Sequence, residues 1–337
     1  MKATYRKYIL QFKQPSGTSR GVFTEKETWF LELHTPENKY IGECGLLRGL
    51  SIDDRTDYQE KLQWVCQHIH LDKETLWEEL MAFPSIQFGV EQIFTALNRE
   101  NPAILFPSEF TTGQKGISIN GLIWMGTPQF MKNQIKEKLK QNFRCIKMKI
   151  GALNFDTEYQ IIKQLRNEFP TNEIEIRVDA NGSFSPHQAL EKLKRLSDLQ
   201  LHSIEQPIAT SQWEEMALLC EKSPLPIALD EELIGVFSRK DKETLLSTIR
   251  PQYIILKPSL IGGYKGSEEW ISLAEKQQIG WWITSALESN IGLNAIAQWT
   301  FTLQNPIPQG LGTGSLYTNN IESNLQVRQG HLFMNNS

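Results

Sequence analysis

Three carboxylic acids follow short apolar runs at nearly equal spacing. Asp179 ends EIEIRVD, Glu205 follows LHSI and Asp230 follows LPIAL, so the acids lie 26 and 25 residues apart. One strand, one helix and two loops of a parallel α/β protein have this length, so the acids should meet at one edge of a sheet. Close, buried carboxylates repel one another unless a cation lies between them. Oxygen ligands without His or Cys favour Mg²⁺ or Mn²⁺ over zinc, and the sequence therefore predicts a magnesium site.

Two further apolar runs carry lysines near their C-terminal ends. Lys147 and Lys149 lie in CIKMKI, where a period of two places both side chains on one face of a strand, and Lys257 follows YIIL. Because burial disfavours the ammonium form, the pKa of Lys149 should fall toward neutrality, and the amine could act as a general base. Lys147 is expected to lie deeper, to pair with a carboxylate and to keep Lys149 out of an ion pair. A base beside a divalent cation suits removal of a proton from the carbon next to a carboxylate, because the cation stabilises the second negative charge.

Simpler explanations exist for each of these residues. Any one acid could cap the following helix or pair with a surface lysine, and either lysine could be a surface charge with its stem on apolar residues. Three acids in register, with lysines on both sides of them along the chain, make a shared site the better interpretation. Glu231 and Glu232 directly follow Asp230 and stay open as alternative acids at that position.

The elements that must position these residues read as an α/β barrel. From about residue 116, eight apolar runs begin 24 to 29 residues apart and alternate with amphipathic segments. This pattern predicts a TIM-type barrel with its active site at the C-terminal ends of the strands. A doubly wound open sheet is the alternative, but no GxGxxG motif follows an early strand.

The first part of the chain lacks this alternation of apolar runs and amphipathic segments. Residues 5–12, 27–33 and 39–47 read as strands, a polar loop is expected over 14–21, and residues 58–99 read as helical. We therefore expect an α+β capping domain over 1–110, completed by residues from about 315 to 337, and a barrel over 111–315.

Composition limits the classes of partner. The 337 residues are 40% hydrophobic with a net charge of −4, and no long basic run suggests a nucleic-acid partner. The sequence contains no stretch of 18 apolar residues, so no membrane span is predicted, and the first residues do not resemble a signal peptide. Four scattered cysteines without a CxxC pair fit a reduced, cytoplasmic protein. Whether it is a monomer or a homo-oligomer stays open.

Taken together, the motifs resemble a known family. They are K-x-K (147–149), D-A-N (179–181), E-Q-P (205–207), D-E (230–231) and K-P-x-x-x-G-G (257–263). The set resembles the enolase superfamily, and within it the muconate-lactonizing-enzyme subgroup. The resemblance implies a modified (β/α)7β barrel with an N-terminal α+β cap, in which Asp179, Glu205 and Asp230 bind Mg²⁺ and Lys149 and Lys257 form the catalytic pair. No histidine ends a predicted strand, unlike in the mandelate-racemase branch.

Two later stretches, residues 283–299 and 310–321, resemble the o-succinylbenzoate synthases of this subgroup. Dipeptide epimerases carry Asp-x-Asp where residues 310–314 here hold no acid, which favours an anionic substrate. The resemblance implies a lyase of menaquinone biosynthesis that dehydrates 2-succinyl-6-hydroxy-2,4-cyclohexadiene-1-carboxylate to 2-succinylbenzoate. Lys149 would remove the ring proton and return it to the leaving hydroxyl, while Lys257 would lie over the ring as a cation. The expected substrate-binding residues are Arg20, Ser285, Ser289 and Gly312.

Two alternatives stay open. An N-succinylamino acid racemase or a dipeptide epimerase of the same subgroup would use both lysines as opposed bases. A catalytically silent barrel that binds a partner through its cap is disfavoured by the intact set of acids and lysines.

Overall fold

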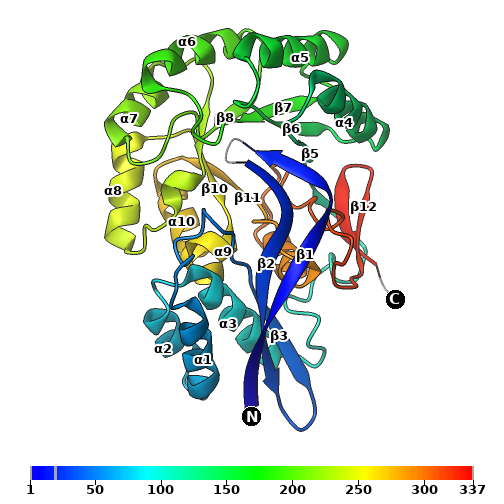
Figure 1. The fold of residues 1–337 in the computed structure, drawn as a ribbon, viewed down its shortest axis with the longest axis vertical. Coiled ribbons are helices and arrows are strands. Elements are labelled where there is room, and N and C mark those ends of the chain that lie inside the picture. Colours follow the sequence, from blue (N-terminus) through cyan, green and yellow to red (C-terminus); the bar gives the residue numbers. More distant parts are fainter. Residues whose placement is uncertain (1, 19–20, 336–337) are drawn as a thin grey trace.

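The chain begins with a three-stranded antiparallel sheet. The computed structural model describes residues 2–18 and 21–335, in which β1 (Lys2–Thr18) pairs with β2 (Gly21–His34), and β2 pairs with β3 (Lys39–Cys44). The β1–β2 hairpin is long and extends from the bottom of the molecule to the barrel (Figure 1). The loop predicted over 14–21 is wrong in extent, because backbone pairing resumes at Ser16 and Phe23 after a register shift. Polar side chains did not prevent this pairing, since the ladder is made by the backbone.

Three helices complete the capping part. They are α1 (Tyr58–His68), α2 (Lys73–Glu79) and α3 (Pro84–Leu97). Helix α3 is buried along nearly its whole length and packs against β3. The contact requires glycine, because a Cβ atom on Gly42 would lie only 2.0 Å from the carbonyl oxygen of Gly89.

A curled parallel sheet forms the wall of the barrel. Its strands follow one another in chain order: β5 (Gly121–Ile123), β6 (Cys145–Lys149), β7 (Glu175–Asp179), β8 (Ser203–Glu205), β9 (Ile227–Leu229), β10 (Tyr253–Leu256) and β11 (Gly280–Ile283). Parallel bridges from Gln309 to Ile119 and from Gly310 to Thr284 complete the ring at the eighth predicted run. The predicted barrel is therefore confirmed, and the open sheet is excluded.

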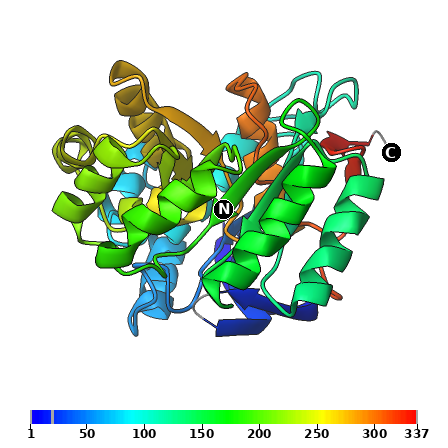
Figure 2. The ribbon, with the colours of Figure 1, turned by 90° about the horizontal axis from the view of Figure 1, so that it is seen from above.

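Helices surround these strands (Figure 2). They are α4 (Pro128–Lys140), α5 (Phe155–Glu168), α6 (Pro186–Ser197), α7 (Trp213–Lys222), the short turn η1 (Glu231–Leu233), α8 (Arg239–Ile249), α9 (Pro258–Ile261), α10 (Gly263–Lys276) and α11 (Asn290–Thr302). Within the described residues, no helix follows the eighth run, so the order is that of a (β/α)7β barrel.

The C-terminal segment runs back along both parts of the molecule. The amide of Thr318 donates to the carbonyl of Gln11, and the hydroxyl of Tyr8 donates to the carbonyl of Asn319, so this stretch lies against β1. The chain then forms β12 (Leu325–Arg328) and β13 (His331–Met334), and β13 pairs with β4 (Ile117–Ser118) before the barrel wall. The boundaries proposed for the two domains stay a prediction.

The joint between cap and barrel lies at two consecutive glycines. The indole nitrogen of Trp77 donates to the carbonyl of Gly262 at 3.1 Å, and Glu91 of α3 accepts from the amides of Tyr264 and Lys265 at the start of α10. A Cβ atom on Gly263 would lie 2.0 Å from Glu91 Oε2, and its φ is +70°. Glycine is therefore required here by both the close approach and the backbone conformation.

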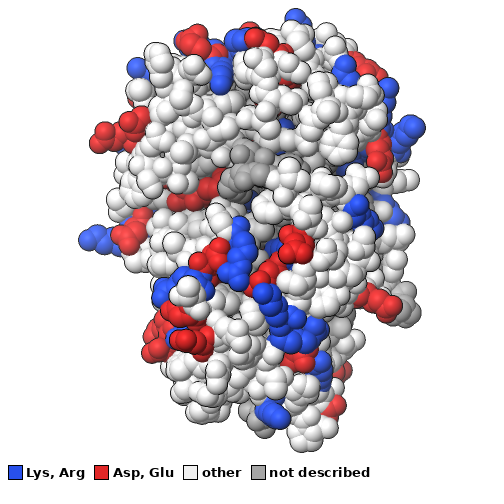
Figure 3. Space-filling model, in the orientation of Figure 1, with Lys and Arg blue, Asp and Glu red and all other residues white. Residues whose placement is uncertain are grey.

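Charges of both signs are mixed on the visible surface of the cap (Figure 3). In β2, Glu27 pairs with Lys7 and Arg48, each at 2.5 Å. None of the helices in the described ranges combines the length and apolar character needed to cross a membrane.

Asp53 anchors the loop before α1 to the first turn of α3. Its Oδ2 accepts hydrogen bonds from the amide (2.9 Å) and hydroxyl (2.6 Å) of Ser85. Burial raises the pKa of the Asp53 carboxyl from 3.8 to about 6. The folded state therefore binds this proton more tightly than the unfolded chain, and the stability it contributes is present below about pH 4 and lost as the pH rises through about 6.

Asp53→Asn keeps one acceptor oxygen and cannot ionise, so its free energy of unfolding should improve relative to wild type as the pH rises from 4 to 7. The slope should not exceed about 1.4 kcal/mol per pH unit, measured by urea unfolding across this range. Asp54→Asn is the control of opposite sign, because hydrogen bonds from Gly49 and Arg48 outweigh burial and lower the pKa of Asp54. Parallel pH profiles for wild type and Asp53→Asn would contradict the assignment.

Candidate active site

The register of the parallel strands brings the predicted residues to one rim of the barrel. Lys149 lies opposite Asp179 in the β6–β7 pair, and Asp179 lies opposite Glu205 in the β7–β8 pair. Asp230 directly follows β9, and Lys257 directly follows β10. The three acids are at most 3% exposed. The six strand-end residues predicted from the sequence, Lys147 included, thus gather at the same place.

Three ammonium groups face the three carboxylates. Lys147 Nζ lies 2.9 Å from Asp179 Oδ2 and also pairs with Glu205. Lys149 Nζ donates to the same Asp179 oxygen at 2.8 Å and to Asn181 Oδ1 at 2.8 Å. Lys257 pairs with Asp230. The expectation that Lys147 keeps Lys149 out of an ion pair is therefore wrong here, because both lysines share one carboxylate.

The balance of burial and charge differs from the sequence expectation. Burial alone would lower the pKa of Lys257, but Asp230 and Glu205 outweigh it and raise that pKa. The same holds for Lys147, whose pKa is raised by Asp179 and Glu205 despite burial. Desolvation was expected to dominate at a strand-end lysine, but at Lys257 the carboxylate of Asp230 outweighs it, whereas Lys147 pairs with carboxylates as expected.

The pKa values of Asp179 and Glu205 shift in opposite directions, although both side chains are buried among the same charges. Burial would raise the pKa of Asp179, but Lys147 and Lys149 lower it well below the usual range. For Glu205, burial and the charge of Asp179 together raise the pKa well above the usual value, against the pull of Lys147. Of the three carboxyl groups, Glu205 is therefore the one whose negative charge is compensated least by the lysines.

The donor set fits a divalent cation. In the ranges 2–18 and 21–335, no three His, Cys, Asp or Glu side chains are already spaced as ligands of one ion. The three carboxylates form ion pairs with lysines instead. The donors are all oxygen and all buried, and Glu205 Oε1 accepts no hydrogen bond from the described residues, although Lys257 Nζ lies 4.0 Å from it. A buried carboxyl oxygen without a hydrogen-bond donor is a position that a hard cation would satisfy. Asp179, Glu205 and Asp230 are the residues that could hold it.

The alternative acids have other partners. Glu232 accepts from the Trp213 indole at 2.9 Å and from the Ser211 amide at 2.8 Å, while Glu231 accepts from Asn181 Nδ2 at 2.9 Å. Glu232 therefore holds the loop after β8 in place, which leaves Asp230 as the preferred third acid.

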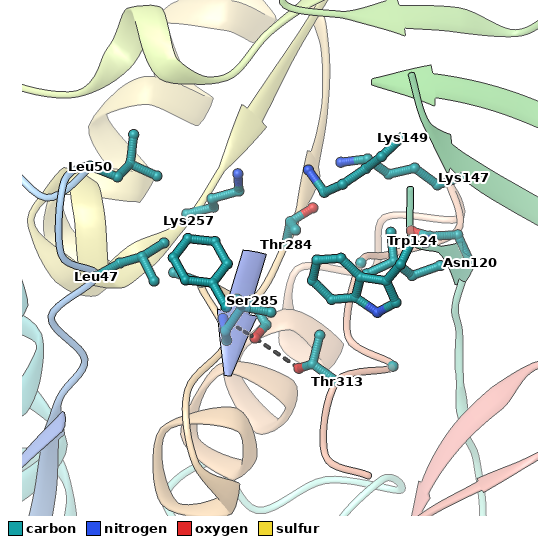
Figure 4. A pocket seen from close by; sticks show the side chains of 16 residues that line it. Leu47, Leu50, Asn120, Trp124, Lys147, Lys149, Lys257, Thr284, Ser285 and Thr313 are labelled. Atoms are coloured by element: carbon teal, nitrogen blue, oxygen red, sulfur yellow. Dashed lines mark hydrogen bonds between the residues drawn. The ribbon is translucent and has the colours of Figure 1, made fainter. Parts of the chain in front are cut away.

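A cavity opens directly beside these groups (Figure 4). Lys147 and Lys149 enter it from one side, and Lys257 enters from the opposite side, with the ammonium ends directed toward one another. Thr284 and Ser285 follow β11 and form the wall between them, where Thr313 Oγ1 donates to Ser285 Oγ at 2.9 Å.

The cap closes part of this cavity. Phe23 of the β1–β2 hairpin and Leu47 and Leu50 of the loop after β3 line it, together with Trp124 after β5. Sequence reasoning pointed to residues 49–51 as a segment that closes over the substrate, which includes Leu50, but it did not single out Phe23, Leu47 or Trp124. The available signal was weak: two leucines in a turn-rich loop, whose position over the barrel depends on contacts distant in sequence.

The expected substrate-binding residues divide into three groups. Ser285 and Gly312 line the cavity. Ser289 is not among the described residues that line it; its hydroxyl donates to Glu43 at 2.5 Å and accepts from the Ile291 amide at the start of α11. Arg20 lies outside the described residues. A role for Ser289 in substrate binding is therefore not favoured by its position.

Comparison with known proteins agrees with this geometry. The family model described as "Enolase C-terminal domain-like" matches residues 131–336. The chain is 46% identical to the o-succinylbenzoate synthase of Desulfotalea psychrophila, over 98% of each chain. The crystal structure of MenC from that organism superposes with a TM-score of 0.88 at 43% identity and covers 99% of both chains.

A second enzyme type is similar over a shorter stretch. The N-succinylamino acid racemase of Thermus thermophilus is 34% identical over 47% of this chain and 40% of its own. The resemblance to the enolase superfamily is confirmed by the family match and by the near full-length similarity. The chain belongs to the o-succinylbenzoate synthase family of the enolase superfamily.

Proposed function

We propose that the chain catalyses the dehydration of 2-succinyl-6-hydroxy-2,4-cyclohexadiene-1-carboxylate to 2-succinylbenzoate. The observation that carries the proposal is a cavity lined by lysines on opposite sides, each paired with a buried carboxylate, in a chain 46% identical to an o-succinylbenzoate synthase along nearly its whole length. The segment 310–314 in the cavity wall contains no acid, which suits a substrate with two carboxylates.

Lys149 is the proposed acid and base. In its neutral form, the Nζ atom takes the proton from the ring carbon next to the substrate carboxylate. The ammonium so formed donates a proton to the departing hydroxyl on the same face, so one molecule of water leaves and the ring becomes aromatic. Asn181 Oδ1 accepts a hydrogen bond from Nζ at 2.8 Å and orients the amine beside the cavity. General acid–base catalysis of this kind contributes about 10²- to 10⁴-fold.

Lys257 is the proposed electrostatic partner. It reaches the cavity from the side opposite Lys149 and is paired with Asp230. An ammonium group in this position places positive charge near the face of the ring, where it attracts the electrons of the dienolate. Dehydration needs a single base, so Lys257 does not have to accept a proton.

Membership of the superfamily suggests dependence on a divalent metal. We propose Mg²⁺, with Mn²⁺ as a substitute, held by Asp179, Glu205 and Asp230. The cation supplies positive charge at the substrate carboxylate, where the reaction places a second negative charge. Four free cysteines support a reducing, cytoplasmic location.

Racemisation of N-succinylamino acids is the second candidate. Two lysines facing one another across the cavity favour it, because racemisation needs a proton acceptor and a proton donor on opposite faces. The similarity to the Thermus thermophilus racemase covers only 47% of this chain, so we place this activity second.

The first experiment follows the loss of diene absorbance when purified protein and Mg²⁺ are mixed with the cyclohexadiene substrate. We expect rapid formation of 2-succinylbenzoate and a loss of at least about 100-fold on addition of chelator, restored by excess Mg²⁺. Folded, metal-loaded protein that leaves the diene unchanged would refute the proposal. Deuterium exchange at the α-carbon of N-succinylamino acids would then test the second candidate.

A further inference from the structure

The loop that follows Lys149 is held by a carboxylate from the next helix. Glu158 of α5 is 1% exposed, and its Oε1 and Oε2 both accept a hydrogen bond from the amide of Gly151, each at 2.9 Å. Its Oε1 also accepts from the amide of Leu153 at 3.0 Å. Gly151 is only two residues after Lys149, so this side chain fixes the backbone directly behind the proposed base.

The contacts of Glu158 are those of a carboxylate near the start of a helix. Both oxygens act as acceptors, whereas a protonated acid would turn an O–H group toward an amide donor. Burial raises the pKa of this carboxyl, and the amides of Gly151, Leu153 and Ala152 oppose the rise. The carboxylate also lies in the first turn of α5, near the positive end of the helix dipole. Stabilising the start of α5 is therefore the simplest role for Glu158.

The contacts extend further, because the loop held by Glu158 packs against the loop that carries Asn181. A Cβ atom on Gly151 would lie 2.0 Å from Ser183 Oγ and 2.6 Å from Ser183 Cβ, and the φ of Gly151 is +100°. Only glycine allows this approach at this φ. Ser183 is two residues after Asn181, whose Oδ1 accepts from Lys149 Nζ at 2.8 Å. The loops on the two sides of this hydrogen bond thus touch at Gly151.

The backbone between Glu158 and the amine contains no free link. The amide of Ile150 donates to the carbonyl of Asp179 at 2.8 Å, and the next amide, that of Gly151, donates to Glu158. The side chain of Lys149 itself donates to Asp179 Oδ2 at 2.8 Å. A displacement of the loop is therefore passed on to Lys149 rather than absorbed by an unrestrained segment.

We propose that Glu158 is a positioning residue for proton transfer, which holds residues 150–153 so that Lys149 Nζ stays beside Asn181 and directed into the cavity. The inference rests on the proposed function, because Lys149 is the proposed acid and base. Glu158 is not among the described residues that line the cavity. It acts on the reaction only through the backbone of the loop and through Lys149.

Glu158→Gln places an amide NH₂ group where an oxygen now accepts from Gly151, so the loop loses part of its support. We expect kcat for the cyclohexadiene substrate to fall about 10- to 100-fold, with KM within about 2-fold of wild type, because a displaced base weakens the transition state alone. Affinity for Mg²⁺ should not change. With substrate deuterated at the ring carbon next to the carboxylate, the isotope effect on kcat should increase, because proton removal becomes slower than the other steps.

Asn154→Ala is the matched control for a purely structural role. Asn154 is exposed and caps the same helix, where its side chain accepts from the Asp156 amide at 2.9 Å. Both variants weaken the start of α5, but only Glu158→Gln releases the amides of Gly151 and Leu153. Asn154→Ala should therefore lower the Tm while kcat and the isotope effect stay as in wild type.

Hydrogen exchange provides a readout that needs no substrate. Glu158→Gln should speed exchange of the amides in 150–153 and 180–183, while exchange in β8 to β10 stays as in wild type. Asn154→Ala should leave exchange in both loops unchanged. Unchanged loop exchange in Glu158→Gln, or faster exchange spread evenly over the barrel, would overturn the inference whatever reaction the protein catalyses.

The kinetic outcomes separate this inference from the proposed function. Wild-type kcat in Glu158→Gln, an equal loss in Asn154→Ala, or a rise in KM at constant kcat would overturn the role of Glu158. If the wild-type protein leaves the diene unchanged, the proposed function fails, and deuterium exchange at the α-carbon of N-succinylamino acids becomes the assay. Glu158→Gln should then slow exchange of the one enantiomer whose proton faces Lys149, and equal slowing of both enantiomers would refute the inference.

Discussion

Lys149→Ala is expected to abolish dehydration, with kcat reduced by about 10³- to 10⁴-fold. The variant removes the only proposed base, and no other lysine takes its place, because Lys147 is held between Asp179 and Glu205. The fold should survive, since Asp179 keeps its 2.9 Å contact with Lys147 after the substitution. The measurement is kcat from the diene assay, with circular dichroism to verify folding.

Lys257→Arg is the matched comparison. It keeps a positive charge on the opposite side of the cavity, so part of the dehydration should remain, whereas racemisation should be lost with its second base. Wild-type dehydration by Lys149→Ala would remove Lys149 from its assigned role. Equal losses of dehydration in both variants would favour a mechanism in which both lysines transfer protons.

Glu205→Gln should reduce affinity for Mg²⁺ by more than roughly 100-fold, because changes outside the direct ligands already cost 10- to 100-fold. Activity at moderate Mg²⁺ should fall in parallel. In the metal-free protein the loss of the Lys147–Glu205 ion pair should be offset in part, since burial and Asp179 already disfavour the charged form of Glu205 and raise its pKa. Titration calorimetry with Mg²⁺ and urea unfolding of the metal-free protein measure the two effects.

Glu232→Gln provides the control at a neighbouring buried acid. Its partners are Ser211, Trp213 and Gln206, so metal affinity should not change even if stability falls. Unchanged Mg²⁺ affinity in Glu205→Gln, or its loss in Glu232→Gln, would mean that the ligands have been assigned to the wrong acids.

The strand-end residues could be predicted because they obey local rules. Apolar runs, their spacing and the parallel register together determine that Lys149, Asp179 and Glu205 become neighbours. Each of these signals is present within one βα unit of sequence. The barrel and the position of its rim follow from the same periodicity.

The remaining features depend on contacts that no local pattern encodes. The hairpin over 14–18 continues as strand because its partner strand is present, although its composition suggests a loop. Phe23 and Leu47 reach the cavity only after the cap has docked on the barrel. Lys149 forms an ion pair because the Asp179 carboxylate on the next strand lies within 2.8 Å of its Nζ atom. This distance, and with it the pairing of lysines and acids at the rim, could not be deduced from the types of residue alone.

The glycine pair Gly262–Gly263, where the cap contacts the barrel, limits how caps can be exchanged between related proteins. Glu91 accepts from the Tyr264 amide in the first turn of α10, and Trp77 donates a second hydrogen bond to the Gly262 carbonyl, which already accepts from the Gly266 amide. A barrel separated from its cap would expose this corner and leave the amides of Tyr264 and Lys265 without their Glu91 acceptor, so we regard the two parts as one cooperative folding unit. Any chimaera that transplants a cap must carry α2 and α3 together with the α9–α10 corner, or the segment that begins at Lys257 loses its support.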